Sequence, residues 1–151
     1  MNENCIFCKI VNKDIPSQKI WENDEFYAFL DLQPNCKWQT LVIPKKHYDS
    51  DLFAINDEWF YGRYMKAIDE VVNLLKKSLW VVRVGMIMEG MWVNHLHIKL
   101  YPMRWLDKEW KPVEAEEKVF YDIYPGFLTT KMWEALSQEE LAKVANEITW
   151  N

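Results

Sequence analysis

Two of the chain's three histidines, His95 and His97, stand one residue apart in the segment VNHLHIKL. Residues two apart on a β-strand point to the same face, so both imidazoles are predicted to face one side while Leu96 faces the other. Burying two imidazoles without partners would cost about 1–3 kcal/mol each. We therefore expect them to act as metal ligands or as reactive nitrogens. Lys99 continues the alternation and is expected on the same face.

A second chemically active pair is Cys5 and Cys8, which form a C-x-x-C motif near the start of the chain. Such a pair can be half of a metal site, a redox pair or two buried thiols that pack as small apolar groups. A redox pair typically follows a strand and opens a helix, whereas this pair leads into a proline turn at residues 14–17. The redox interpretation is therefore disfavoured. A zinc site would need two more ligands from the histidines or carboxylates.

The segments that must position these residues differ in their hydrophobic period. Apolar residues at three-to-four spacing from Phe60 to Leu75 predict a helix of about twenty residues that begins near Asn56 or Asp57. Short turns between the strands favour an antiparallel meander followed, after the helix, by a hairpin. Together these elements predict the α+β class. The predicted strands are rich in aromatic and β-branched residues and cover residues 19–23, 25–31, 38–44, 80–88 and 92–102.

The pattern beyond residue 103 is irregular until Ser137, where the capping box SQEE and the apolar residues after it predict a short helix. We expect a main domain over residues 1–110. The remaining residues, 111–151, are expected to form a C-terminal helical extension that packs on the same domain.

The composition limits the classes of protein to consider. The chain has 151 residues and a formal net charge of −5, and no block of lysine and arginine predicts binding to a nucleic-acid polymer. The most apolar stretch is interrupted by Arg83 and is much shorter than the ~20 residues of a membrane span. Three cysteines without a secretory signal favour a reducing cytoplasm.

Four segments, in this order, closely resemble the histidine triad (HIT) family of nucleotide hydrolases and transferases. They are CIFCKIVNKDIPS, FYAFLDLQP, TLVIPKKH and VNHLHIKLYP, within residues 4–103. The resemblance implies a five-stranded antiparallel sheet with one long helix, and usually a homodimer. It also implies a nucleotide substrate, with a purine base expected, bound in a cleft beside the histidines.

The resemblance also implies roles for individual residues. The second triad histidine, His97, would be the nucleophile that forms a nucleotidyl intermediate. Asp31 would hydrogen-bond the ribose. Gln39 departs from the family, which often has a histidine there, but it could still hydrogen-bond the nucleotide. Ile15, Phe29 and Leu32 would form apolar walls around the base, with Phe7 as a weaker candidate. The zinc-binding branch of the family holds structural zinc through the residues that are here Cys5, Cys8, His47 and His95.

Two departures from the family pattern keep alternative functions open. Lys99 stands where the family has its third histidine, and it could bind phosphate or simply end the strand in solvent. The segment MEGMWVN before the histidines is short and apolar, and its Glu89 would repel phosphate if it faced the site. The leading prediction is hydrolysis of a nucleoside phosphoramidate, a dinucleoside polyphosphate or an adenylate-type bond. The alternatives are a zinc-stabilised nucleotide-binding module without efficient catalysis, or a nucleotidyl transferase.

Overall fold

The structure is a computed structural model that describes residues 2–34, 36–104, 106, 108–113, 115–123 and 139. The chain divides into two units, residues 1–111 and residues 112–151, close to the predicted boundary. The first unit contains all the helices and strands that are described below. The packing of the extension on the main domain stays a prediction. The helix predicted from Ser137 lies outside the described residues apart from Glu139.

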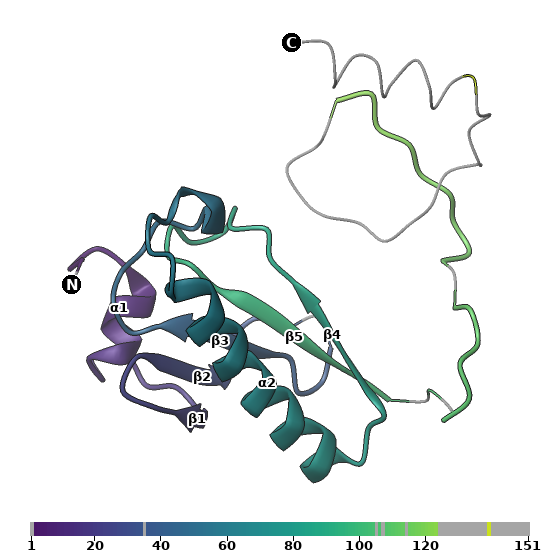
Figure 1. The fold of residues 1–151 in the computed structure, drawn as a ribbon, viewed down its shortest axis with the longest axis horizontal. Coiled ribbons are helices and arrows are strands. Elements are labelled where there is room, and N and C mark those ends of the chain that lie inside the picture. The colour runs from purple at the N-terminus through teal and green to yellow at the C-terminus, as the bar shows by residue number, and fades with distance from the viewer. Residues whose placement is uncertain are drawn as a thin grey trace. The chain divides into compact units, whose positions relative to one another are not determined.

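The first unit is built around one five-stranded antiparallel sheet (Figure 1). Its strand order is β1-β2-β3-β5-β4, so the predicted meander of the first three strands and the hairpin of the last two are both confirmed. The long helix between β3 and β4 completes the α+β class that the sequence predicts. The strands are β1 Lys19–Glu22, β2 Phe26–Leu30, β3 Thr40–Pro44, β4 Arg83–Ile87 and β5 Ile98–Met103.

The long helix, α2 (Phe60–Leu79), packs against one face of this sheet. Its apolar stripe meets the strand residues that point toward it, such as Ala28, Val42 and Ile98, and these three strand residues are fully buried. The helix begins at Phe60, three residues after Asp57, and the Asp57 carboxylate accepts hydrogen bonds from the amides of Trp59 and Phe60. Asp57 therefore caps the helix from outside its first turn.

The opposite face of the sheet is covered at one end by a short helix, α1 (Ile6–Val11). This helix was not predicted from the sequence. Cys5 is its N-terminal cap residue and Cys8 lies within it, so the cysteine pair does open a helix, although no described strand precedes it. The helix packs on Phe29, Leu41 and Ile43, the strand residues that point away from α2. Its own contribution to this second core comes from Cys5, Phe7, Cys8 and Ile10.

The two histidines precede strand β5, so the prediction that they lie on that strand is wrong. The strand begins at Ile98, and the connection from β4 is longer than the three-residue turn that the sequence favoured. The predicted alternation nevertheless holds. Leu96 packs in the core beneath α2, whereas both histidine rings contact the Phe7 ring on the other face.

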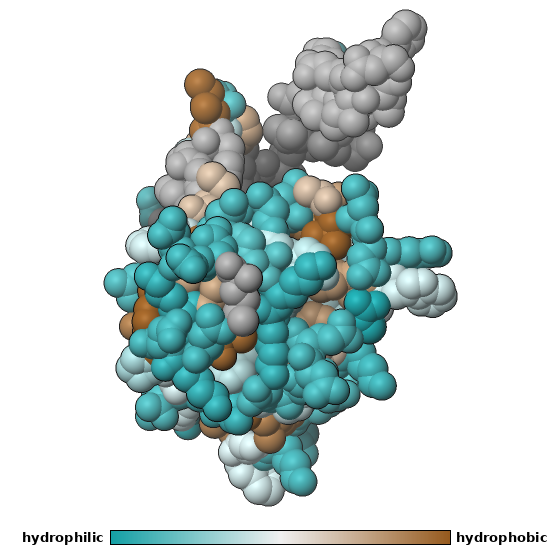
Figure 2. Space-filling view, turned by 90° about the vertical axis from the view of Figure 1, so that its left-hand side faces the viewer, coloured by the Kyte–Doolittle hydropathy of each residue, from teal (hydrophilic) through white to brown (hydrophobic). Residues whose placement is uncertain are grey.

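Among the described residues, no helix combines the length and the apolar composition that a membrane span requires. The face of the molecule in Figure 2 is mostly hydrophilic, and its hydrophobic residues lie in small separate patches. A short 3₁₀ helix, η1 (Leu52–Ala54), lies between β3 and α2.

His95 and His97 both contact Phe7 of α1, on the face of the sheet opposite α2. The predicted metal and nucleotide sites are therefore expected on the face that α1 covers only in part.

Candidate functional site

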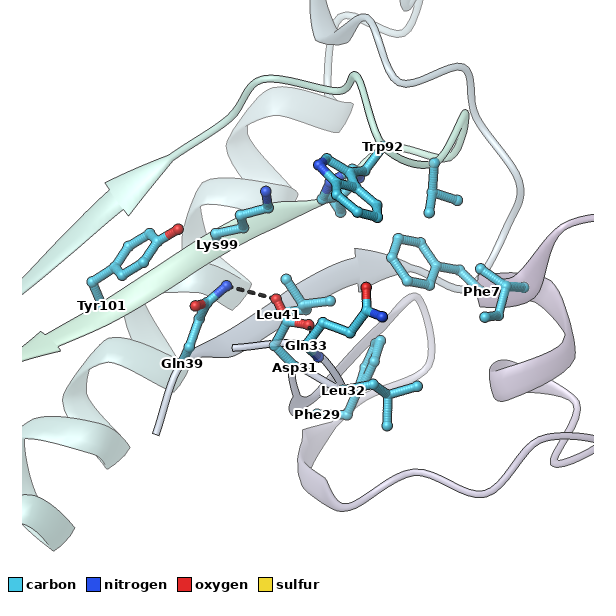
Figure 3. Close-up of a pocket in the computed structure, with 13 residues that line it drawn as sticks. Phe7, Phe29, Asp31, Leu32, Gln33, Gln39, Leu41, Trp92, Lys99 and Tyr101 are labelled. Atoms are coloured by element: carbon cyan, nitrogen blue, oxygen red, sulfur yellow. Dashed lines mark hydrogen bonds between the residues drawn. The ribbon is translucent and has the colours of Figure 1, made fainter. Parts of the chain in front are cut away.

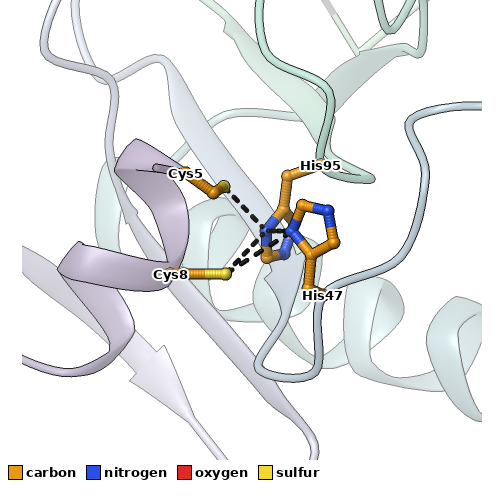
Figure 4. Close-up of side chains that lie close together, drawn as sticks. All are labelled: Cys5, Cys8, His47 and His95. Carbon is orange, nitrogen blue, oxygen red and sulfur yellow. Dashed lines mark hydrogen bonds between the residues drawn. The ribbon is translucent and has the colours of Figure 1, made fainter. Parts of the chain in front are cut away.

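Two cysteines and two histidines from distant parts of the chain meet beside α1 (Figure 4). Their ligand atoms all lie within 4.8 Å of one another. The Nδ1 atom of His95 lies 3.3 Å from the Cys5 sulfur, 3.7 Å from the Cys8 sulfur and 3.3 Å from the Nδ1 of His47. The Cys8 sulfur lies 3.5 Å from the same His47 nitrogen. The four predicted ligands thus form a single cluster.

The protonation of His95 follows from its other ring nitrogen. Its Nε2 lies 2.9 Å from the carbonyl oxygen of Pro44. Because a carbonyl oxygen can only accept, Nε2 carries the proton and Nδ1 offers a lone pair to the cluster. Burial is the main cause that lowers the pKa of His95 to about 4. The ring is therefore neutral near neutral pH, as a metal ligand must be.

This cluster fits a tetrahedral zinc ion. Zinc binds sulfur at ~2.3 Å and imidazole nitrogen at ~2.0–2.1 Å, so a tetrahedral site needs ligand-to-ligand distances of about 3.3–3.8 Å. Four of the six ligand-to-ligand distances, 3.3, 3.3, 3.5 and 3.7 Å, lie in that range, and all six are within 4.8 Å. Both cysteines are free of disulfides and buried. Two cysteines and two histidines leave no open position, which is typical of a structural site rather than a catalytic one.

His97 is held differently from His95. Its Nδ1 lies 2.7 Å from the backbone carbonyl oxygen of His95, so Nδ1 is the protonated nitrogen and Nε2 carries the lone pair. The side chain is 2% exposed, and its ring meets the Phe7 ring edge-on. Burial and the Lys99 charge lower the pKa of His97, against the opposite effects of the His95 carbonyl, Glu89 and Asp31. A neutral imidazole with one fixed tautomer is suited to nucleophilic attack.

His97 lines a pocket of about 650 Å³ on the face of the sheet that α1 leaves accessible (Figure 3). This volume is within the range of small-molecule sites. One wall is formed by the site face of β5, and the opposite wall by β2 and the segment that follows it. Of the predicted catalytic and substrate-binding residues, seven line this pocket: Phe7, Phe29, Asp31, Leu32, Gln39, His97 and Lys99.

Ile15 is the predicted substrate-binding residue that the pocket does not include. It follows α1 and packs against the second core. It also lines a separate cavity of about 290 Å³ together with Ile10 and Tyr27. Ile15 is therefore not among the residues that line the pocket, and its contact with the base stays a prediction.

The polar floor of the pocket is organised around Asp31. Its Oδ2 atom accepts a 2.6 Å hydrogen bond from the Nε2 of Gln39, and its Oδ1 atom accepts one from the backbone amide of Gln33 at 2.9 Å. Figure 3 shows the Gln39 amide directed at the Asp31 carboxylate. Two fixed donors hold the carboxylate in one orientation, with lone pairs left to accept from a ligand's hydroxyl groups.

Lys99 forms an ion pair with Glu89, whose carboxylate accepts a hydrogen bond from the lysine ammonium. The side chains are 17% and 12% exposed, so the pair is largely removed from solvent. Lys99 points into the pocket, as the alternation predicts, and does not simply end the strand in solvent. Glu89, from the segment between β4 and β5, neutralises it.

Several residues of the pocket were not predicted from the sequence. Tyr101 follows Lys99 by two residues on β5, so the alternation that identified His97 and Lys99 also points to it. Trp92 has no such signal, because it lies in the irregular segment before the histidines and its side chain is 76% exposed. The other unpredicted lining residues are Ile6, Gln33, Leu41 and Val93.

Comparison with known proteins matches residues 12–104 to a family model described as the HIT domain. The match spans more than half of the chain and contains His47, the histidine pair and the pocket residues of β2, β3 and β5. The chain belongs to the HIT domain family. This confirms the predicted resemblance to the family. The match begins after Cys5 and Cys8, and membership of the zinc-binding branch stays a prediction.

Individual relatives extend the similarity of this HIT domain. An adenosine 5'-monophosphoramidase of Candida albicans is 34% identical over 165 residues, covering 95% of each chain. An uncharacterized HIT-like protein of Methanocaldococcus jannaschii is 37% identical over 102 residues, which are 65% of this chain and 78% of the relative. A crystal structure from Streptococcus mutans has a TM-score of 0.69 and 27% identity, covering 99% of this chain and 86% of the other.

Proposed function

We propose that this HIT domain is a nucleotide hydrolase that cleaves a nucleoside phosphoramidate, a dinucleoside polyphosphate or an adenylate-type bond through a nucleotidyl-His97 intermediate. The observation that carries the proposal is the state of His97. Its Nδ1 donates a hydrogen bond to the His95 carbonyl, which leaves the lone pair on Nε2. His97 is also one of the residues that line the pocket. The Candida relative named as an adenosine 5'-monophosphoramidase supports the phosphoramidate as the first substrate to test.

The reaction would proceed in two displacements at phosphorus. The Nε2 of His97 attacks the α-phosphorus, a P–Nε2 bond forms, and the bond to the leaving group breaks. When the substrate is a phosphoramidate, the leaving amine takes a proton from solvent as it departs. Water then attacks the same phosphorus and loses a proton to solvent, the P–Nε2 bond breaks and the nucleoside monophosphate leaves. Catalysis of this kind depends on the positioning of the reacting atoms.

Other residues would bind and orient the nucleotide. The Asp31 carboxylate, held by Gln39 and Gln33, is suited to accept hydrogen bonds from the two ribose hydroxyls. Phe29 and Leu32 supply apolar surface for the base. Lys99, in place of the family's third histidine, would contact phosphate oxygens as a compact positive charge.

The cluster of Cys5, Cys8, His47 and His95 is proposed to hold structural zinc. Bound zinc would link three parts of the chain to one another, because its ligands come from α1, from the segment after β3 and from the segment before β5. The cluster is thereby connected to the active residue, since the His95 carbonyl also fixes the His97 tautomer. A homodimer and a cytoplasmic location stay predictions.

One observation favours a second candidate function. Because Glu89 neutralises Lys99, the pocket has little net positive charge to stabilise a transferring phosphoryl group. A nucleotide-binding module with slow catalysis is therefore the alternative. It would bind a nucleotide without accumulating a nucleotidyl-His97 adduct. A transferase, the third alternative, would form product only when an acceptor phosphate is supplied.

The test is turnover of adenosine phosphoramidate and diadenosine polyphosphates by wild type and His97→Ala. Wild type should release AMP, and intact mass after rapid quenching should reveal an adenylyl adduct that His97→Ala lacks. An unchanged melting temperature and metal content of His97→Ala would separate loss of chemistry from loss of fold. Absence of AMP release by wild type from every one of these substrates would overturn the hydrolase proposal.

A further inference from the structure

The Glu89–Lys99 pair is an unusual feature for a pocket that is proposed to bind phosphate. Both side chains are more than four-fifths buried, so their charges are only weakly screened by solvent. Among the described residues that line the pocket, the fixed charges are those of Asp31 and Lys99. The single lysine of the wall is therefore already compensated by a carboxylate.

The other cations in this part of the fold do not restore a positive excess. The ammonium of Lys37 and the guanidinium of Arg104 lie 4.6 and 4.3 Å from the centre of the Trp38 ring. Neither residue lines the pocket. A substrate that carries several phosphates would thus meet a wall with one lysine, balanced by Glu89, and with the additional negative charge of Asp31.

Each further phosphate makes this charge balance less favourable. If Lys99 turns to a phosphate, the Glu89 carboxylate loses its partner in a largely buried position, which is costly. If Lys99 stays with Glu89, the added phosphate meets no compensating charge. A single phosphate at the His97 position needs one contact, whereas a polyphosphate adds negative charges beside a wall whose one lysine is already paired with Glu89.

We propose that Glu89 is a specificity-determining residue, which makes the pocket select nucleotides with one phosphate and discriminate against those with a polyphosphate chain. The inference rests on the proposed nucleotide site and deepens it. It favours a leaving group without phosphates, such as an amine, over a second nucleotide. Glu89 acts in this through Lys99 and through its own charge, and it takes no part in bond breaking.

The test is calorimetric binding of AMP, ADP and ATP in magnesium-free buffer to wild type and Glu89→Gln. Wild type should bind AMP roughly tenfold or more tightly than ATP. Glu89→Gln should tighten ATP binding by about tenfold, with a much smaller change for AMP. The matched control is Glu70→Gln, the same chemical change at an exposed residue of α2 on the other face of the sheet. It should keep the wild-type ratio.

Two results would overturn the proposal: equal AMP-to-ATP ratios in wild type and Glu89→Gln, or tighter binding of ATP than AMP by wild type. If Glu89→Gln does not fold, the same titrations are made with Lys99→Gln, which leaves the Glu89 charge without its partner, so the preference for AMP over ATP should increase. An unchanged ratio in Lys99→Gln would then refute the role of charge. A wild type that shows the expected ratio but releases no AMP from any substrate would refute the hydrolase proposal alone.

Discussion

Replacement of Cys8 by serine should remove the proposed zinc and strongly destabilise the domain. The Cys8 side chain is 1% exposed, and its sulfur faces both His47 and His95 within the cluster. Serine keeps the approximate size of the side chain but is a poor ligand for zinc, which prefers thiolate and imidazole. With three ligands left, the two histidine nitrogens would face each other without the cation between them.

The size of the effect can be worked out from linkage. A metal that binds only the folded state stabilises it by about 4 kcal/mol when its free concentration is a thousand times its Kd. The unit that contains the cluster spans residues 1–111. For a domain of that size each kcal/mol corresponds to about 4 °C in Tm, so the variant should melt about 15 °C below wild type.

The assay combines metal analysis with calorimetry on wild type, Cys8→Ser and Cys36→Ser. Cys36 is the chain's third cysteine and lies outside the cluster, which makes it the matched control. Wild type and Cys36→Ser should carry about one zinc per chain, and a strong chelator should bring wild type to the Tm of Cys8→Ser. Equal zinc content and equal melting of wild type and Cys8→Ser would refute the structural-zinc argument.

Two further predictions concern the pocket and the core. Asp31→Asn should weaken AMP binding about tenfold, because an amide replaces the charged acceptor and must also face the Gln39 amide. Dideoxy-AMP, which lacks both ribose hydroxyls, should bind the two proteins equally in the same titration, and a tenfold loss for it too would contradict ribose recognition. Tyr64→Phe should lower the unfolding free energy by about 1 kcal/mol in urea titration, since the buried Tyr64 hydroxyl donates a 2.6 Å bond to the Val42 carbonyl. No change in stability would contradict that account.

The elements that carry strong periodicity were predictable from the sequence. The three-to-four spacing over α2 and the alternation of Leu96, Ile98 and Leu100 each follow from one face that is buried in the same core. The same alternation predicted that His97 and Lys99 share a face, and it extends to Tyr101. Because Leu96, Ile98 and Leu100 point into the core, the residues between and after them, His97, Lys99 and Tyr101, must point to the opposite face.

The features that the sequence did not reveal lack periodicity. Helix α1 has six residues, too few for an amphipathic pattern, and no side chain caps it. Trp92 reaches the pocket from an irregular segment, where neither a period of two nor one of 3.6 applies. Ile15 was assigned to the pocket from the family resemblance, but the direction of the chain after α1 depends on tertiary packing that no local pattern encodes.

The His97 ring can donate a hydrogen bond to the His95 carbonyl, two residues earlier, because the chain is not a regular strand there. In a regular antiparallel strand the His95 carbonyl would bond to a neighbouring strand, and it could not reach the ring of His97. Here the His95 amide bonds the Val93 carbonyl, and the His95 carbonyl accepts from the Nδ1 of His97. The contact with the strand β3 is made instead by the His95 ring, through the Pro44 carbonyl. Strand β5 can begin only after this arrangement, at Ile98, and a local irregularity thus joins the metal cluster to the reactive nitrogen.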